Sequence, residues 1–158
     1  VNMRISITVG ADQFKNGYLN IDPISGELDG GIKADVRNLD EIVMDSECVE
    51  IIAEEVLDYL ELESAKAAIA HWVKKLRHGG KIIISGTDYY EVCKQTMQRT
   101  IDINQFNHLI HGEFVQPWDV KMSHMSINDL QNELNSHGIK ILKRRVNGFS
   151  MVIEGERP

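Results

Sequence analysis

The sequence predicts an α/β domain in which helices flank a mostly parallel sheet, and three observations predict it. Short β-branched or apolar runs alternate with segments of helical periodicity along the 158 residues, as in parallel strands joined by crossovers. The run 81–85 (KIIIS) is nearly all apolar, which is typical of a central strand buried on both faces. Asn147-Gly148 between two apolar runs indicates a β-hairpin at the C-terminal end.

The expected strands can be placed from their boundaries. Glycine, proline and turn-rich stretches punctuate the chain between β-branched runs. We expect strands over 4–9, 18–22, 32–36, 49–53, 81–85, 139–146 and 149–154. The sheet therefore has seven strands, and the last one is antiparallel.

The expected helices follow from apolar spacing and capping signals. Apolar residues at i, i+3 and i+4 give a helix over 64–76 one buried face. Asp88-x-x-Glu91 has the form of a capping box that opens a helix over 88–101, and Ser126-x-x-Asp129 caps a last helix. Only seven residues separate Gly10 from Tyr18. This is too few for the usual crossover helix, so we expect the first crossover helix to be reduced or absent.

Composition narrows the class of protein. A hydrophobic fraction of 42% and a charged fraction of 26% are those of a soluble globular protein, and we expect one domain over 1–158. The formal net charge of −7 disfavours non-specific binding to nucleic acid or to anionic membranes, so a small molecule is the favoured partner. No stretch approaches the roughly 18 apolar residues of a membrane helix.

The cysteines, the N-terminus and the basic run bear on the compartment and on the partner. Cys48 and Cys93 lie in unrelated contexts, which favours two buried, reduced thiols in a cytoplasmic protein. No basic region precedes an apolar run at the N-terminus, so no secretory signal is expected, although Val1 leaves a trimmed leader open. The only basic run, 143–145, lies in a predicted strand, where a solvated edge is favoured over an RNA-binding patch.

Four segments carry a family likeness that spans nearly the whole chain. They are ISITVG with GYLNIDP, IKADVRNL, VEIIAEEVLDYL, and AIAHWVKKLRHGGKIIISGTD. A fifth segment carries a weaker likeness, HGEFVQPWDVKMSHMSINDLQNELNSHGIKI. Together they resemble the small class I S-adenosylmethionine-dependent methyltransferases. The resemblance implies a Rossmann-like three-layer sandwich and S-adenosylmethionine as the cofactor. The sequence departs from the family pattern at two places. Gly10 is not followed by the second glycine of the family's Gly-x-Gly, and Asp58-Tyr59 stands where Glu-His is usual.

The candidate cofactor site follows from the ends of the first four strands. In an open parallel sheet, ligands bind beyond the carboxyl ends of the strands, where the strand order reverses. Asp22 is predicted to accept hydrogen bonds from both ribose hydroxyls, as in the family, or alternatively to cap the turn at Pro23. Asp35 would accept from the adenine amino group, and Gly10 would let the chain approach the amino-acid end. The candidate cofactor-binding residues are Val9, Gly10, Ala11, Asp22, Pro23, Asp35, Val36 and Glu54.

The candidate catalytic residues lie beyond the fourth strand. Methyl transfer is an in-line displacement, so the protein supplies positioning and a general base. His124 falls where the family's C-terminal segment carries a histidine, and Glu55 directly follows the fourth strand. Alternatively, His124 is a surface histidine, and Glu55 is an acid that opens a short helix. Tyr89, Tyr90 and Trp118 either shape an acceptor pocket or pack, and no metal site is predicted.

The predicted function is S-adenosylmethionine-dependent methyl transfer to a small acceptor. One alternative is a non-catalytic methyltransferase-like binding or scaffolding module, which the glycine-poor loop would fit. A dinucleotide-binding oxidoreductase would also place an acid after the second strand, but the G-x-G-x-x-G fingerprint is missing. A chain this short would need a small acceptor, a second copy as in a homodimer, or a partner subunit.

Overall fold

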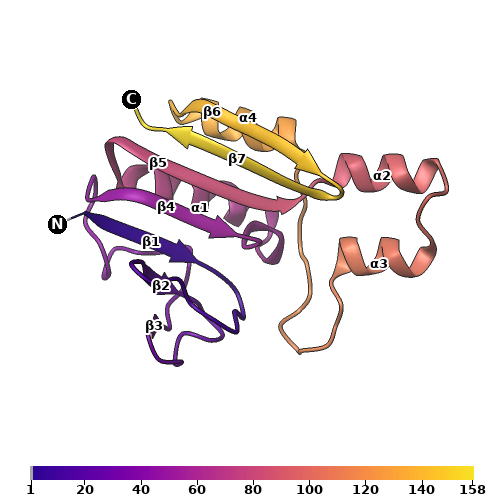
Figure 1. Ribbon diagram of the computed structural model, residues 1–158, viewed down its shortest axis with the longest axis horizontal. Helices are drawn as coiled ribbons and strands as arrows, with labels where there is room; N and C mark the ends of the chain where they lie inside the picture. The colour runs from indigo at the N-terminus through magenta and orange to yellow at the C-terminus, as the bar shows by residue number, and fades with distance from the viewer. Residues whose placement is uncertain (1) are drawn as a thin grey trace.

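The computed structural model describes residues 2–158 and is built on a seven-stranded sheet (Figure 1). The strand order is β3-β2-β1-β4-β5-β7-β6. Neighbouring strands from β3 to β5 are parallel, whereas β7 is antiparallel to both β5 and β6. The strands are β1 (Met3–Ile7), β2 (Leu19–Ile21), β3 (Gly31–Ile32), β4 (Cys48–Glu54), β5 (Leu76–Thr87), β6 (Lys140–Asn147) and β7 (Ser150–Glu156). The predicted Rossmann-like sheet with an antiparallel C-terminal hairpin is confirmed.

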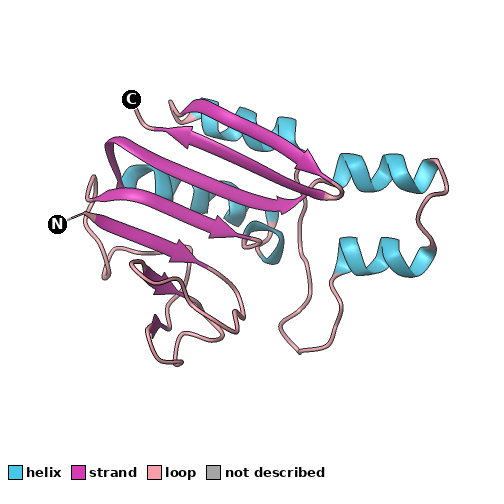
Figure 2. Ribbon diagram, viewed as in Figure 1, coloured by secondary structure: helices cyan, strands magenta, loops and turns pink. Residues whose placement is uncertain are grey.

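The helices fall into two groups (Figure 2). Helices α1 (Leu62–Lys75) and α4 (Ile127–Ser136) lie side by side and cover one face of the sheet. Helices α2 (Tyr89–Met97) and α3 (Ile103–His111) extend beyond the carboxyl end of β5, and we call residues 89–111 the helical arm. A short 3-10 helix, η1 (Leu57–Tyr59), follows β4.

Loops take the place of helices in the first three connections of the sheet. Within residues 2–158, the three connections from β1 to β4 contain no helix, which confirms that the first crossover helix is absent. Residues of the β1–β2 connection contact β4 instead. The Tyr18 hydroxyl donates to Glu50, and the Lys15 ammonium lies 2.5 Å from the Glu54 carboxylate.

The helical arm differs from the prediction. The helix expected over 88–101 ends at Met97, and a second helix, α3, was missed. Asp102 opens α3 with a full capping box to Gln105, which is a signal that the sequence contains. The box predicted at Asp88 is incomplete because the Asp88 amide donates to the Phe149 carbonyl and is not free to bind a side chain. The box predicted at Ser126 is confirmed.

The third strand is shorter than predicted. It was expected over 32–36 but pairs only at Gly31–Ile32. Beyond it, the Val36 carbonyl accepts a hydrogen bond from a helix rather than from a neighbouring strand. The chain therefore leaves the sheet early, and residues 33–37 form a loop at its edge.

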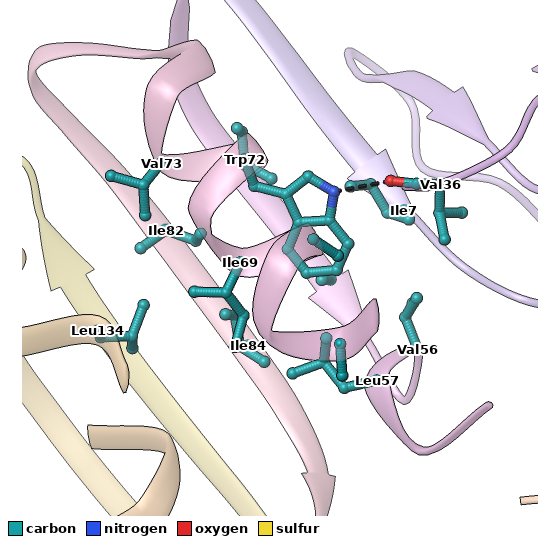
Figure 3. Close-up of a cluster of buried hydrophobic side chains, with 14 of the residues drawn as sticks. Ile7, Val36, Val56, Leu57, Ile69, Trp72, Val73, Ile82, Ile84 and Leu134 are labelled. Carbon is teal, nitrogen blue, oxygen red and sulfur yellow. Dashed lines mark hydrogen bonds between the residues drawn. The ribbon is translucent and has the colours of Figure 1, made fainter. Parts of the chain in front are cut away.

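The main core lies between the sheet and helices α1 and α4 (Figure 3). Ile7, Ile82 and Ile84 come from alternating positions of β1 and β5 and face the helices, as the two-residue period of a strand requires. Trp72 of α1 is fully buried among them, and its indole Nε1 donates to the Val36 carbonyl at 2.9 Å. The core thereby holds the loop over 33–37 in place.

Three further expectations can be compared with the structure. Cys48 is buried, and burial, with the nearby Glu47 charge, raises the pKa of its thiol to about 11. Cys93 is exposed, so the expectation of two buried thiols is wrong for this residue, which lies on the outer side of α2. Residues 143–145 are exposed on β6 at the edge of the sheet, as a solvated edge requires. Among residues 2–158, no helix is both long and apolar enough to cross a membrane.

Candidate cofactor cleft

A cleft of about 550 Å³ opens at the carboxyl end of the parallel strands. Its walls come from the segments after β1, β2, β3 and β4, at the β1/β4 position where the strand order reverses. This volume lies within the range of small-molecule sites. The lining residues are Val9, Pro23, Lys33, Ala34, Asp35, Val36, Arg37, Tyr59 and Leu60. Four of these residues are among the predicted cofactor-binding residues: Val9, Pro23, Asp35 and Val36.

Asp22 does not line this cleft, although it is next to Pro23, which does. Its side chain is completely buried, and its carboxylate accepts five hydrogen bonds. Oδ1 accepts from the amides of Gly10 (3.0 Å), Ile24 (2.8 Å) and Ser25 (2.8 Å), and Oδ2 from the Thr8 hydroxyl (2.8 Å) and the Ala11 amide (2.9 Å). One carboxylate thus joins the loop after β1 to the turn after β2.

The five donors keep Asp22 ionised. Burial raises the pKa of Asp22, but the amides of Ala11, Ser25 and Gly10 and the Thr8 hydroxyl outweigh burial and leave the pKa below its usual value. A carboxylate offers about four lone-pair sites, and all are in use. Asp22 therefore caps the turn at Pro23, the alternative left open above. Its predicted role toward ribose requires that some of these donors be exchanged.

Gly10 lies directly beneath an aromatic ring. Its φ is +70°, and a Cβ atom at this position would lie 2.2 Å from Cζ2 of Trp118. Both the left-handed backbone and the close approach require glycine. Trp118 belongs to the segment between α3 and α4, so a distant part of the chain covers the loop after β1. Sequence reasoning named Trp118 but could not place it.

Trp118 and Tyr59 form an aromatic pair beside the cleft. Their ring centroids lie 5.7 Å apart at an interplanar angle of 68°. The Tyr59 hydroxyl donates to Asp119 at 2.9 Å, which fixes the ring against the segment that carries Trp118. Burial, and then this hydrogen bond, raises the pKa of Tyr59. Tyr59 was not predicted as a site residue; the signal was its place in the Asp58-Tyr59 departure from the family pattern.

Asp35 is exposed at the mouth of the cleft and is paired with Arg37. The guanidinium donates Nε at 3.0 Å and Nη2 at 2.8 Å to the two carboxylate oxygens, and the Arg37 amide donates at 2.9 Å. These hydrogen bonds hold the pKa of Asp35 below its usual value. The pair places both an acceptor and a donor of hydrogen bonds at the same edge of the cleft.

Glu54 and Glu55 both follow the buried part of β4 but differ in their contacts. Glu54 is ion-paired with Lys15 and does not line the cleft. Glu55 has φ +55°, a left-handed conformation that is uncommon outside glycine and that clusters at functional sites. Glu55 is exposed at the end of β4, and partial desolvation, and then the charge of Asp58, raises its pKa. Its charge in turn contributes to the raised pKa of Tyr59, which lines the cleft.

His124 belongs to a buried ionic cluster away from the cleft. Its Nε2 lies 2.5 Å from the Ile110 carbonyl oxygen, and its Nδ1 lies 3.8 Å from the buried Asp58 carboxylate. The Lys121 ammonium lies 3.7 Å from the same carboxylate and donates to the Thr87 hydroxyl at 3.1 Å. Burial raises the pKa of Asp58, and the charges of His124 and Lys121 oppose that rise. The surface-histidine alternative is therefore wrong.

The predicted residues thus fall into three places. Val9, Pro23, Asp35 and Val36 meet in the cleft, and Gly10 and Ala11 are held beside it by Asp22. Glu54 and Glu55 lie at the end of β4. His124 lines a different hollow of about 410 Å³, together with Tyr89 and Asp129. No group of three metal-ligating side chains comes together in the part of the chain that the structure describes.

The architecture defines a Rossmann-like α/β protein with a cleft at the switch point of its sheet. Neither a protein-family model nor a curated protein matches the sequence. Solved structures do match. A Thermotoga maritima S-adenosylmethionine-dependent methyltransferase gives a TM-score of 0.64 at 12% identity, over 98% of this chain and 82% of that chain. The chain has the class I S-adenosylmethionine-dependent methyltransferase fold.

Two other solved structures support this fold assignment. A chain of a Haloferax volcanii complex that contains the Trm112 methyltransferase activator gives a TM-score of 0.64 at 9% identity, over 100% of this chain and 84% of that chain. The Burkholderia thailandensis 1,6-didemethyltoxoflavin-N1-methyltransferase, with bound S-adenosylhomocysteine, gives 0.63 at 10% identity, over 99% and 72%. Identities this low establish the fold and leave the activity to be argued from the site.

Proposed function

We propose that the protein binds S-adenosylmethionine in the cleft and transfers its methyl group to a small acceptor. The observation that carries this proposal is the position of the cleft, at the carboxyl ends of β1 and β4, in a sheet with the strand order of a class I methyltransferase. A neighbour of this fold has S-adenosylhomocysteine bound. The net charge of −7 favours a small molecule over nucleic acid as the acceptor.

The residues of the cleft fit the chemistry of this cofactor. Val9, Pro23, Val36 and Leu60 offer apolar walls for an adenine ring, and Asp35 supplies an acceptor for its amino group. The amino-acid end would approach the loop at Gly10, where Trp118 now packs. The Tyr59–Trp118 pair offers aromatic faces to a positive charge, and aromatic faces attract cations.

Binding can be tested by calorimetric titration with S-adenosylmethionine, S-adenosylhomocysteine and NAD. We expect dissociation constants on the order of micromolar for the first two and no heat for NAD. Asp35→Ala should weaken binding about tenfold, because it removes a charged acceptor from an exposed edge of the cleft. Asp29→Ala, which removes an exposed acid from the neighbouring turn, is the matched control and should bind as the wild type does.

We assign to Glu55 the role of the general base that accepts the proton of the methyl acceptor. Bound S-adenosylmethionine supplies an electrophilic methyl group on its sulfonium. Glu55 would take the proton that the acceptor's nitrogen or oxygen loses, since its raised pKa suits proton transfer better than that of an ordinary carboxylate. His124 is less suited, because Nε2 contacts the Ile110 carbonyl, its other ring nitrogen, Nδ1, is buried, and the residue does not line the cleft.

The role of Glu55 predicts a specific kinetic change. In a screen that detects S-adenosylhomocysteine formation, Glu55→Gln should lower kcat about 100-fold with any acceptor that reacts. The same variant should bind S-adenosylmethionine with unchanged affinity, because Glu55 does not line the cleft. Equal activity of wild type and variant would remove Glu55 from the mechanism.

One observation favours a second function, that of a non-catalytic binding module. Trp118 packs on Gly10, and all acceptor sites of Asp22 are taken, so protein atoms occupy the places expected for the amino-acid end and for the ribose contact. A folded protein that binds neither S-adenosylmethionine nor S-adenosylhomocysteine in the titration would support this alternative over the enzyme.

A further inference from the structure

The helical arm exposes apolar side chains that the rest of the fold does not cover. Tyr90 is 66% exposed, Met97 86% and Ile103 75%. None of the nine residues of α3 is buried. A helix this short is marginal in water without packing, and a contiguous apolar surface marks an interaction site. Val92 of α2 is buried and α2 contacts α3, but the outer apolar side chains of the arm have no cover in the single chain.

The exposed side chains form stripes with hollows beside them. Tyr90, Cys93 and Met97 are exposed and share one side of α2, whereas on α3 the exposed Ile103 is followed at the same spacing by the half-buried Phe106 and Ile110. One hollow of about 220 Å³ adjoins Tyr90 and Met97, and another of about 240 Å³ adjoins Ile103 and Phe106. Each copy of the arm thus carries both projecting apolar side chains and recesses that can receive them.

The charges of the arm match those of a second arm. The whole chain has a net charge of −7, but the Lys, Arg, Asp and Glu residues within 89–111 are Glu91, Lys94, Arg99 and Asp102, which sum to zero. An interface around a two-fold axis brings residue i of one copy to residue j of the other, and j to i. Glu91 and Lys94 on neighbouring turns of α2 can then pair twice across the axis. A strongly charged partner would gain nothing from a neutral surface.

We propose that the helical arm is a homodimer interface in which the arms of two copies pack around a two-fold axis. Met97 and Ile103 of each copy enter the hollows of the other, and Glu91 faces Lys94 of the other copy. Phe114 and Val115, which directly follow α3 and are also exposed, extend the same apolar surface. The inference is independent of the proposed methyl transfer.

Sedimentation velocity over a concentration series tests the proposal. The wild type should change from 17.9 kDa to twice that mass, with a dissociation constant on the order of 10 μM. Met97→Glu and Ile103→Glu should each raise that constant about 100-fold, because each places an unpaired charge in an apolar interface. Met44→Glu is the matched control, since Met44 is 72% exposed outside the arm, and it should dimerise like the wild type. Unchanged melting curves would show that the variants fold.

A charge swap tests the two-fold arrangement itself. Glu91→Lys should weaken the dimer about tenfold by placing like charges opposite each other, and Glu91→Lys with Lys94→Glu should restore it. A wild type that stays monomeric at about 100 μM would overturn the proposal. It would also be overturned if Met44→Glu dissociated the dimer as strongly as Met97→Glu, or if the double swap failed to restore dimerisation.

Discussion

Replacing Asp22 by asparagine should destabilise the protein by about 2–4 kcal/mol and weaken S-adenosylmethionine binding at least tenfold, by about 1.4 kcal/mol or more. The carboxylate accepts five hydrogen bonds while completely buried. In asparagine an NH2 group replaces one of the two carboxylate oxygens. This group is a donor, so it faces the donors that the oxygen had bound and leaves them without an acceptor. Urea denaturation measures the change in the free energy of unfolding. Asp12→Asn, an exposed acid in the same connection, is the control and should change stability little.

The same variant should alter the dependence of stability on pH. The pKa of Asp22 is lowered in the folded state, so its ionised form stabilises the fold at pH values above the unfolded pKa of about 3.9. This stabilisation is lost as the pH falls through the lower, folded pKa. The wild type should therefore lose its advantage over Asp22→Asn in acid. If the difference in unfolding free energy between wild type and variant stayed constant from about pH 6 to below about pH 3, ionised Asp22 would not be the source of that difference.

Replacing Trp72 by alanine should cost about 3–5 kcal/mol of unfolding free energy, the largest effect expected from a single core residue here. Trp72 is fully buried between α1 and the sheet, so the variant leaves a cavity that the surrounding strands cannot fill (Figure 3). Equilibrium unfolding measures this loss. A change below about 1 kcal/mol would mean that the core collapses around the smaller side chain.

A phenylalanine at the same position separates packing from hydrogen bonding. Trp72→Phe keeps most of the apolar volume but cannot donate to the Val36 carbonyl, so about 1–2 kcal/mol should be lost. Because Val36 lines the cleft, we also expect weaker S-adenosylmethionine binding. Wild-type affinity in this variant would show that the bond from Trp72 does not position the cleft wall.

The parts of the fold that could be predicted are those with local signals. The strand at 81–85, the Asn147-Gly148 hairpin and the Ser126 capping box each depend on residues close together in sequence, and the structure has all three. The expectation that this strand is buried on both faces is wrong: Lys81 is exposed and Ile83 is only half-buried, because the helices α1 and α4 cover one face. The capping box predicted at Asp88 depends on contacts from elsewhere in the chain. The Asp88 amide pairs with Phe149, so the capping box was lost to a tertiary contact that no local pattern reveals.

The candidate site was predictable in position but not in detail. Topology alone places the ends of parallel strands together, which is why Val9, Pro23, Asp35 and Val36 meet in one cleft. Topology does not say which way a strand-end carboxylate turns, and Asp22 turns toward five protein donors. Nor could the sequence place Trp118 on Gly10, because that contact joins segments at opposite ends of the chain.

The single carboxylate of Asp22 makes the wall of the cleft a cooperative unit. The amides of Gly10, Ala11, Ile24 and Ser25 share one acceptor, so the loop after β1 and the turn after β2 can open only together. β2 and β3 have three and two residues, so few ladder bonds oppose such an opening, although Ile21 and Val36 are part of the core. We expect this edge of the molecule to be a unit of local unfolding. A ligand in the cleft would shift that local equilibrium by mass action and stabilise the part of the protein with least stability of its own.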